Sequence, residues 1–335
     1  MTKVAVVILN YNGERLLRQF LPSVVQHSAG ADIFVADNGS TDLSLTILKT
    51  EFPSVRVVVL EQNYGFCGGY NRALGIISAE YYVLLNSDVE VTAGWLGPLK
   101  SLLDANSDIA AVQPKILSYT NRNAFEYAGA GGGFIDALGY PFCRGRLFDY
   151  SEEDRGQYDD EREVFWTSGA CMMIRSKSFH EHGGFDEDFF AHMEEIDLCW
   201  KLKRSGHRLL YSGQSRVYHL GAGTLDYQNP KKTYLNFRNG LSLLYKHLDS
   251  GEMMYKLPLR LILDWLAALV FLLRGSSKSF FSVWRAHAHF IRDLSKLQTK
   301  RRAIRSRYPH YPKTQMYPGL IVIDYYLRKR KTIDP

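Results

Sequence analysis

Short apolar runs alternate with stretches of helical periodicity over the first third of the chain. Strand-like runs rich in β-branched and aromatic side chains occur at residues 4–9 (VAVVIL), 31–36 (ADIFVA), 55–60 (VRVVVL) and 80–85 (EYYVLL). The intervening stretches place apolar residues on one helix face, as in Leu16, Leu17, Phe20, Leu21 and Val24, and again in Leu43, Ile47 and Leu48. Nearly continuous apolar strands alternating with helices predict an α/β fold with a mostly parallel sheet flanked by helices.

The later part of the chain continues this pattern less regularly. We expect a fifth strand near residues 106–113, a strand within 165–175, an amphipathic helix over 189–207, and a strand with a loop over 211–224. Residues 120–163 are rich in glycine and aromatic side chains but lack periodicity, which predicts a long loop region.

Polar residues and glycines follow each of the first four predicted strands. The four segments are NYNG at 10–13, DNGSTD at 37–42, QNYGFCGGYNRAL at 62–74 and NSDVE at 86–90. Parallel sheets bind ligands beyond the carboxyl ends of their strands. One such polar end is typical of a turn, but four at the same edge indicate a ligand-binding cleft.

Each motif that could bind a nucleotide also has a plain structural explanation. Asp37 could accept a hydrogen bond from the ring N–H of uracil or thymine, or it could cap the following helix. Gly65, Gly68 and Gly69 could let backbone amides approach a nucleotide, or they could form a simple turn. Their spacing matches neither GxxxxGKS nor GxGxxG, so neither fingerprint applies.

The acidic motifs also leave two interpretations open. Asp88 could bind Mg2+ or Mn2+ with help from Asn86 or Glu90, because magnesium prefers one or two carboxylates plus substrate phosphates, or it could belong to a turn. Glu194, Glu195 and Asp197 could be favoured by the helix dipole, or one could act as a general base. His219 could be structural or could bind Mn2+.

In this order, seven motifs together resemble those of inverting family 2 glycosyltransferases with the GT-A (Rossmann-like) fold, in particular the rhamnosyltransferase-like bacterial branch. The motifs are VVILNYNG, VADNGSTD, NYGFCGGYNRAL, LLNSDVEV, SGACMMIR, GGFDEDFFAHMEEIDLCWKLKRSGH and VYHLGAGT. The resemblance implies a catalytic domain over 1–245, with a nucleotide-binding half over about 1–115 and an acceptor-side half over about 116–245. A helical, basic C-terminal region over 246–335 would follow.

The resemblance also implies roles for individual positions. The residues that would bind the nucleotide sugar are Asn10, Tyr11, Asn12, Asp37, Asn63, Gly65, Gly68, Asn71, Arg72, Asn86 and Ser87. The residues that would line the acceptor and sugar side of the site are Trp166, Gly169, Ala170 and Arg238. The metal ligands would be Asp88, His219 and Glu90. Glu195 corresponds to the catalytic base, with Glu194 as the alternative. Two departures are Asn86, where a fuller metal motif has Asp, and the Glu194-Glu195 pair, where many relatives have Glu-Asp.

The implied activity is an SN2-like transfer of one sugar from a UDP- or dTDP-sugar, such as dTDP-rhamnose, to a hydroxyl of a saccharide or polyprenyl-linked acceptor in cell-surface polysaccharide synthesis. Glu195 would take the hydroxyl proton, and Mg2+ or Mn2+ would neutralise the departing diphosphate. The absence of a QxxRW element favours single transfer over polymerisation. The alternatives are a sugar-nucleotide nucleotidyltransferase, for which LNYNGERLL is an unsuitable first loop, and a non-catalytic membrane-peripheral member of the fold.

Charge is distributed unevenly along the chain, whose net charge is +6 at pH 7. Residues 1–225 have a balance of −8, whereas residues 226–335 have a balance of +14. The apolar segment 257–273 is too short and, with Arg260 and Asp264, too charged for a transmembrane span. In the next segment, Phe280, Phe281, Trp284 and Ile291 share one side. These features predict interfacial helices on an anionic inner leaflet, with a homodimer interface as the alternative.

The expected cellular location of the protein rests on two patterns that we do not find in the sequence. The start of the chain enters a strand-like run without a signal-peptide pattern, and the four cysteines have no metal-like spacing. We therefore expect reduced thiols and a cytoplasmic protein that is peripheral on the inner face of the cytoplasmic membrane. No nucleic-acid recognition motif accompanies the basic charge, so nucleic acid is not an expected partner.

Overall fold

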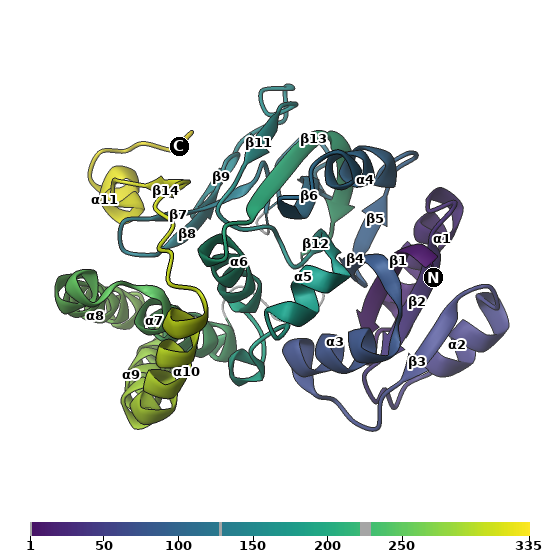
Figure 1. Cartoon of the computed structure of the whole chain (residues 1–335). Coiled ribbons are helices and arrows are strands. Elements are labelled where there is room, and N and C mark those ends of the chain that lie inside the picture. The colour runs from purple at the N-terminus through teal and green to yellow at the C-terminus, as the bar shows by residue number, and fades with distance from the viewer. Residues whose placement is uncertain (1, 127–128, 222–228) are drawn as a thin grey trace.

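A nine-stranded sheet forms the centre of the part of the chain that this computed structural model describes, residues 2–126, 129–221 and 229–335 (Figure 1). Its strand order is β11-β13-β6-β12-β4-β1-β2-β3, and β5 pairs with β13. The strands are β1 (Thr2–Asn10), β2 (Asp32–Asp37), β3 (Arg56–Val59), β4 (Ala79–Asn86), β5 (Val89–Val91), β6 (Ile109–Ser118), β11 (Glu161–Glu163), β12 (Cys171–Arg175) and β13 (Arg208–His219).

The first four predicted strands are parallel neighbours, as expected. β1 pairs with β4 on one side and with β2 on the other, and β2 pairs with β3. In this register Asn10 lies opposite Asp37, and Leu9 lies opposite Asn86. The polar strand ends therefore meet at one edge of the sheet. β12 is the main departure from parallel order, because it runs antiparallel between β4 and β6.

Two apolar cores cover the two faces of the sheet. In β1, Ala5 and Val7 belong to one core, whereas Val4, Val6 and Ile8 belong to the other. Alternate residues of a strand point to opposite faces, so a strand covered by helices on both sides needs an uninterrupted apolar run. The covering helices are α1 (Glu14–His27), α2 (Ser44–Glu51), α3 (Gly65–Ile76), α4 (Leu96–Ala105), α5 (Ser176–Glu181) and α6 (Glu194–Arg204).

The prediction of a long loop over residues 120–163 is wrong, because this segment contains four strands of a second sheet and the edge strand β11. The second sheet has the order β10-β9-β8-β7-β14 and consists of β7 (Gly133–Asp136), β8 (Pro141–Cys143), β9 (Arg146–Leu147), β10 (Tyr150–Ser151) and β14 (Met316–Tyr317). The strands are two to four residues long, too short for periodicity to register. One partner strand, β14, comes from the far end of the chain.

The C-terminal region is helical, as predicted. The predicted range 246–335 contains α8 (Ser250–Leu273), α9 (Ser277–Arg292), α10 (Leu294–Arg307) and α11 (Ile321–Tyr326). Most of α7 (Pro230–His247) precedes this range, and α7 packs against α8, α9 and α10. In Figure 1, α7 to α10 form one group, and α11 lies beside the second sheet. None of the described helices combines the length and apolar character required to cross a membrane. All four cysteines are buried and free of disulfide bonds.

Candidate functional site

The ends of β1 and β2 are held together by a small network of buried side chains. Asn10 Nδ2 donates to Asp37 Oδ1 over 3.0 Å and to Ser40 Oγ over 3.3 Å. The other carboxylate oxygen of Asp37 accepts from the Ser40 amide over 3.0 Å. Asn12, at a φ of 49°, accepts from the Thr41 amide, while the side chain of Tyr11 is exposed. The structure thus gathers four predicted nucleotide-binding residues at this edge, with one aromatic ring facing solvent.

Two asparagines fix the start of α3. Asn63 Oδ1 accepts from the Gly65 amide over 2.8 Å, and Asn38 bonds both Asn63 and the Gly65 carbonyl. Gly65 has a φ of 71°, and a side chain there would meet the ring of Phe190. The first free amides of the helix, those of Phe66 and Cys67, donate to the Phe190 carbonyl at 3.0 and 3.4 Å. A backbone carbonyl therefore already occupies the positive end of this helix.

Asn71 and Arg72 connect α3 to the segment that precedes α6. Asn71 bonds the amide and the carbonyl of Phe185 through both ends of its side chain, at 2.9 and 2.8 Å. Arg72 donates to Glu187 over 3.0 Å and stacks 3.8 Å over the ring of Tyr64. Both residues are half-buried beside the candidate site and make intramolecular contacts in this state.

Asp88, directly after β4, and His219, at the end of β13, form a buried pair. His219 Nε2 lies 3.1 Å from Asp88 Oδ1, and its Nδ1 lies 3.1 Å from Glu126 Oε2. Burial would lower the pKa of His219, but the carboxylates of Asp88 and Glu126 outweigh it and raise that pKa to about 10. Asn86 Nδ2 lies 3.5 Å from the same Nε2. Two predicted metal ligands, 131 positions apart, therefore meet.

Glu90 is placed differently from the other two predicted metal ligands. Both oxygens of its carboxylate accept from Arg122 Nη2, at 2.7 and 2.9 Å. Glu90 lies opposite Tyr218 in the β5–β13 ladder, and Tyr218 points to the other face of β13 from His219. Ser87 is half-buried between Asn86 and Asp88.

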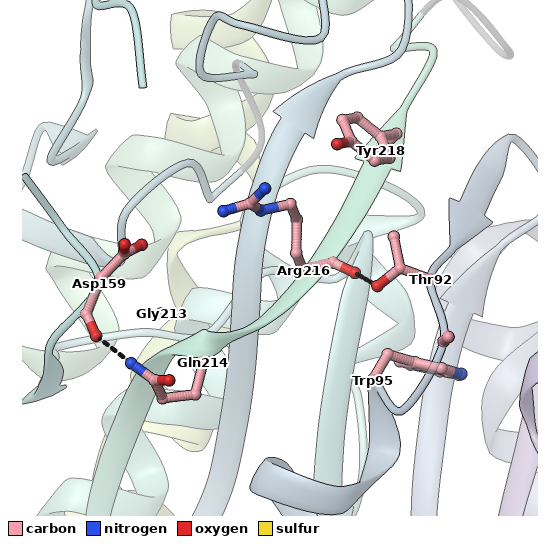
Figure 2. A pocket seen from close by; sticks show the side chains of 8 residues that line it. Thr92, Trp95, Asp159, Gly213, Gln214, Arg216 and Tyr218 are labelled. Carbon is pink, nitrogen blue, oxygen red and sulfur yellow. Dashed lines mark hydrogen bonds between the residues drawn. The ribbon is translucent and has the colours of Figure 1, made fainter. Parts of the chain in front are cut away.

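A surface hollow of about 340 Å³ lies beside β13, on the side of Arg216 and Tyr218 (Figure 2). Its walls are joined by two hydrogen bonds, from Gln214 to the Asp159 carbonyl and from Thr92 to the Arg216 carbonyl. The residues that line it are Thr92, Ala93, Trp95, Asp159, Gly213, Gln214, Arg216 and Tyr218. None of the predicted site residues belongs to this lining, so we place the candidate site at the strand ends instead.

The two candidate bases lie at the start of α6, next to the end of β4. A methyl group at Gly169 would lie 3.4 Å from the ring of Phe66 and 3.9 Å from Glu195 Cβ. The neighbouring Ala170 carbonyl accepts from the Asn86 amide over 3.0 Å. This short segment therefore links Glu195 to the strand end that precedes Asp88. Two predicted acceptor-side residues, Gly169 and Ala170, lie between the base and the metal motif.

Burial perturbs both glutamates. The Oε2 atoms of Glu194 and Glu195 are shielded from solvent and have no hydrogen-bond partner within the described ranges. Burial raises the pKa of Glu195 to about 7, and burial with the Glu195 charge raises the pKa of Glu194 well above its ordinary value. A carboxyl whose pKa is near neutrality is suited to general base catalysis. Glu195 is half-buried and lies near Gly169, whereas Glu194 is buried.

Asp197 anchors α6 to α7 through buried ion pairs. It pairs with Lys246 at 2.6 Å and His247 at 2.8 Å from α7, and with Lys201 at 3.6 Å from its own helix. Burial would raise the pKa of Asp197, but Lys246 and Lys201 outweigh it and hold that pKa well below its usual range. A carboxylate kept ionised by buried cations is a structural anchor rather than a base.

Trp166 and Arg238 make contacts that the sequence did not indicate. The indole of Trp166 is buried against Gly133 and donates to the Phe134 carbonyl over 2.8 Å, which ties the connection between β11 and β12 to β7 of the second sheet. Arg238 donates to the carbonyls of Asp188 and Phe189 at 2.7 and 3.0 Å, in the segment before α6.

Sequence reasoning missed three residues that shape the site. Glu126 holds the imidazole of His219, Asn38 orders the start of α3, and Asn239 of α7 bonds the backbone before α6. Asn38 stands beside Asp37 in DNGSTD, and Asn239 follows Arg238 in YLNFRNG, so both lay inside motifs already noticed. Glu126 lies in the segment interpreted as a loop, and no local signal connects it to a histidine 93 positions away.

The architecture is that of GT-A glycosyltransferases. TarS residues 1–349 from S. aureus, in complex with UDP-GlcNAc, superimpose with a TM-score of 0.58 at 16% sequence identity, covering 91% of this chain and 88% of that chain. A mannosyltransferase from Pyrobaculum calidifontis, in complex with GDP-Man and Mn2+, has a TM-score of 0.52 at 13% identity, covering 92% and 87%.

The family follows from the sequence comparison. The pattern of glycosyl transferase family 2 matches residues 5–183, more than half of the chain, and the protein belongs to this family. It is therefore a glycosyltransferase, as predicted. N-acetylglucosaminyl-diphospho-decaprenol L-rhamnosyltransferase from Mycobacterium tuberculosis is 28% identical over 237 residues, which cover 64% of this chain and 75% of that protein. The predicted rhamnosyltransferase-like branch agrees with this similarity.

Proposed function

We propose that this glycosyltransferase transfers a single hexose or deoxyhexose, with inversion, from a UDP- or dTDP-sugar to a hydroxyl of a saccharide or polyprenyl-linked acceptor in cell-surface polysaccharide synthesis. dTDP-rhamnose is the favoured donor, because the Mycobacterium tuberculosis relative is a rhamnosyltransferase named for a decaprenol-linked substrate. In this proposal the catalytic domain spans residues 1–245, and residues 246–335 attach the enzyme to the membrane and support the catalytic domain.

The observation that carries the proposal is the position of Glu195. Its side chain lies beside Gly169, next to the end of β4; one carboxyl oxygen is shielded from solvent, and burial raises the pKa of the carboxyl group to about 7. A base with this pKa accepts the acceptor hydroxyl proton near neutral pH. Attack from the side opposite the departing diphosphate then inverts the anomeric centre. Asn10, Asp37 and the exposed Tyr11 would hold the nucleotide at the neighbouring strand ends.

The metal side of the proposal rests on Asp88 and His219. No cluster of three or more metal-type side chains is preformed within the described residues. One carboxylate and one imidazole are nevertheless a suitable donor set for Mn2+, because the remaining ligands can come from the diphosphate of the donor. Bound there, the ion would neutralise the leaving diphosphate. The ion requires His219 to give up its proton, and Glu126 would then orient the neutral ring.

A panel of nucleotide sugars tests this function directly. Thermal shifts would be measured with UDP-, dTDP- and GDP-sugars, each with and without Mn2+, because a ligand that binds the native state raises its melting temperature by mass action. We expect a dTDP- or UDP-sugar to give the largest shift, and the shift to depend on Mn2+. A GDP-sugar as the strongest ligand would overturn the donor assignment, and equal shifts without metal would overturn the metal assignment.

The membrane proposal rests on α8, whose polar residues face inward. Arg260 and Asp264 are buried and joined at 2.9 Å, and Arg260 also stacks 3.6 Å over Tyr140 of the second sheet. The outward face of α8 is mostly apolar instead, and α9 adds three exposed apolar residues among exposed basic ones. Their exposed large apolar residues are Met254, Tyr255, Leu259, Ile262, Trp265, Leu266, Leu269, Val270, Leu272, Leu273, Phe281, Trp284 and Ile291. A surface of this kind indicates contact with lipid or protein.

We commit to an anionic lipid surface as the partner of this face. Arg274 is exposed in the turn after α8, and Lys278 is exposed in the first turn of α9. Each could contribute about 1 kcal/mol of attraction to anionic headgroups. The polyprenyl-linked acceptor would lie in the same membrane. The enzyme would then be peripheral on the inner face of the cytoplasmic membrane.

Flotation with anionic vesicles tests the lipid face. The double variant Leu266→Glu/Leu273→Glu should lose most vesicle binding, whereas Ile76→Glu, which changes an equally exposed residue at the end of α3, should float like the wild type. Undiminished flotation of the double variant would refute the lipid contact. Unchanged flotation together with a shift from dimer to monomer would assign the face to a second copy.

A further inference from the structure

The turn that leads into α6 has an unusual backbone. Phe190, His192 and Met193 have φ values of 65°, 68° and 73°, although none of them is glycine. Phe190, with a ψ of −54°, is the centre of a γ-turn in which the Ala191 amide donates to the Phe189 carbonyl over 2.8 Å. This form of γ-turn is rare and strained. Such a segment persists only when the surrounding structure holds it in place.

A single buried side chain on α7 bonds this turn at three points. Asn239 Nδ2 lies 3.1 Å from the carbonyl oxygen of Phe189, 2.9 Å from that of Ala191 and 2.7 Å from that of His192. An amide group has two N–H donors, so these three oxygens share both of them. On its other side, Asn239 Oδ1 accepts from Arg238, which fixes the orientation of the amide.

The same turn is bonded from the nucleotide half of the molecule. The Phe190 carbonyl accepts from the first amides of α3, and the Phe190 ring fills the space where a side chain on Gly65 would lie. At its other end, the Met193 carbonyl accepts from the Asp197 amide in the first turn of α6. A change in the turn would therefore move the start of the helix that carries Glu195.

We propose that Asn239 is a positioning residue for Glu195. By holding residues 189–193 in their strained conformation, Asn239 makes α6 begin at Glu194 and keeps the side chain of Glu195 beside Gly169. The inference rests on the proposed role of Glu195 as the base. A displacement of about 1 Å at a reacting group can lower a rate by about 100-fold, so loss of this support should act mainly on kcat.

Asn239→Asp is the most direct test, because it preserves the shape of the side chain and its acceptor for Arg238 but removes both donors. Turnover would be measured with the nucleotide sugar that gives the largest thermal shift. We expect kcat to fall by about 100-fold, with the KM for that donor unchanged within about threefold. Asn239→Gln keeps the N–H donors and should recover part of the lost rate. If the aspartate variant does not fold, Asn239→Ala is measured in its place in the same way.

Hydrogen exchange supplies a readout that is independent of activity. Amides of residues 189–195 should exchange at least tenfold faster in Asn239→Asp than in the wild type, while those of β1 and β4 keep their rates. Ser242→Ala is the matched control, because its hydroxyl donates only within α7, to the Arg238 carbonyl, and it should change neither exchange nor turnover.

The outcomes separate this inference from the proposed function. Unchanged exchange at 189–195, or faster exchange with an unchanged kcat, would overturn the positioning role. A loss of rate that comes equally from KM, or that Ser242→Ala reproduces, would overturn it as well. If the wild type turns over no nucleotide sugar, the proposed function fails, while the exchange rates still decide whether Asn239 holds the turn.

Discussion

Replacing Glu195 with glutamine should stabilise the protein at alkaline pH while it removes transfer. Burial raises the pKa of this carboxyl from its ordinary value of 4.5 to about 7. The folded state therefore holds the proton more tightly than the unfolded chain does. The stabilisation from this group is complete below about pH 4.5 and is lost as the pH rises through about 7. Above that pH, the wild type must keep a charged carboxylate in a poorly solvated position.

The expected size follows from the shift in pKa. One pKa unit corresponds to about 1.36 kcal/mol, so the shift to about 7 corresponds to about 3 kcal/mol. Glutamine cannot ionise, so E195Q should have a larger free energy of unfolding than the wild type by up to about 3 kcal/mol at pH 8, and by less than about 1 kcal/mol at pH 5. At pH 8 this is a rise in melting temperature of roughly 5 °C. Turnover should fall by about 100-fold or more, the usual contribution of a general base.

Thermal unfolding at pH 5 and pH 8, together with donor turnover at pH 8, would check both effects. Glu181→Gln is the control, because the side chain of Glu181 is exposed at the end of α5, and we expect it to change neither quantity. A melting temperature of E195Q at pH 8 equal to or below that of the wild type would refute the reasoning. An equal gain at both pH values would attribute the effect to packing rather than to ionisation.

Three further perturbations test other parts of the structure. Glu194→Gln should keep at least a tenth of the wild-type kcat, and a loss as large as that of E195Q would move the base to Glu194. Asp88→Ala should weaken Mn2+ binding, measured by titration calorimetry with donor present, by tenfold or more; unchanged affinity would contradict the metal assignment. Arg260→Met should lower the free energy of unfolding in urea by about 3–5 kcal/mol, because the buried Asp264 loses its guanidinium partner and keeps the His287 ring at 3.3 Å, whereas Arg260→Met/Asp264→Leu should recover much of that loss.

The parallel core and its polar edge were predictable because their signals are local. Runs such as VAVVIL and YYVLL can be buried on both faces only in a sheet covered by helices on both sides. Parallel order then brings the ends of four strands to one edge, and the pairing of Asn10 with Asp37 and of Leu9 with Asn86 confirms this. The metal ligands were predicted from family resemblance rather than from periodicity; two of them, Asp88 and His219, lie 3.1 Å apart, and their role as ligands stays a prediction.

The second sheet and the partners of the site residues were not predictable in this way. Strands of two to four residues, such as β8 and β9, show no measurable alternation, and their pairing depends on distant segments such as β14. Phe190 gives no local sign that its carbonyl will occupy the start of α3. Likewise, the hydrogen bonds of Asn239 with the turn before α6 join positions 47–50 residues apart.

The sequence by itself determined the α/β class, the edge of the sheet that carries the polar motifs, and the membership of the chain in its family, because each depends on composition and spacing over short distances. Only the tertiary structure decided which side of the C-terminal helix α8 is buried, because that helix is apolar on nearly all sides. In α8 it turned the charged pair Arg260 and Asp264 inward and left the apolar residues outside. It also set the environment of Glu195, because a pKa near 7 arises from burial that no neighbour in the sequence supplies.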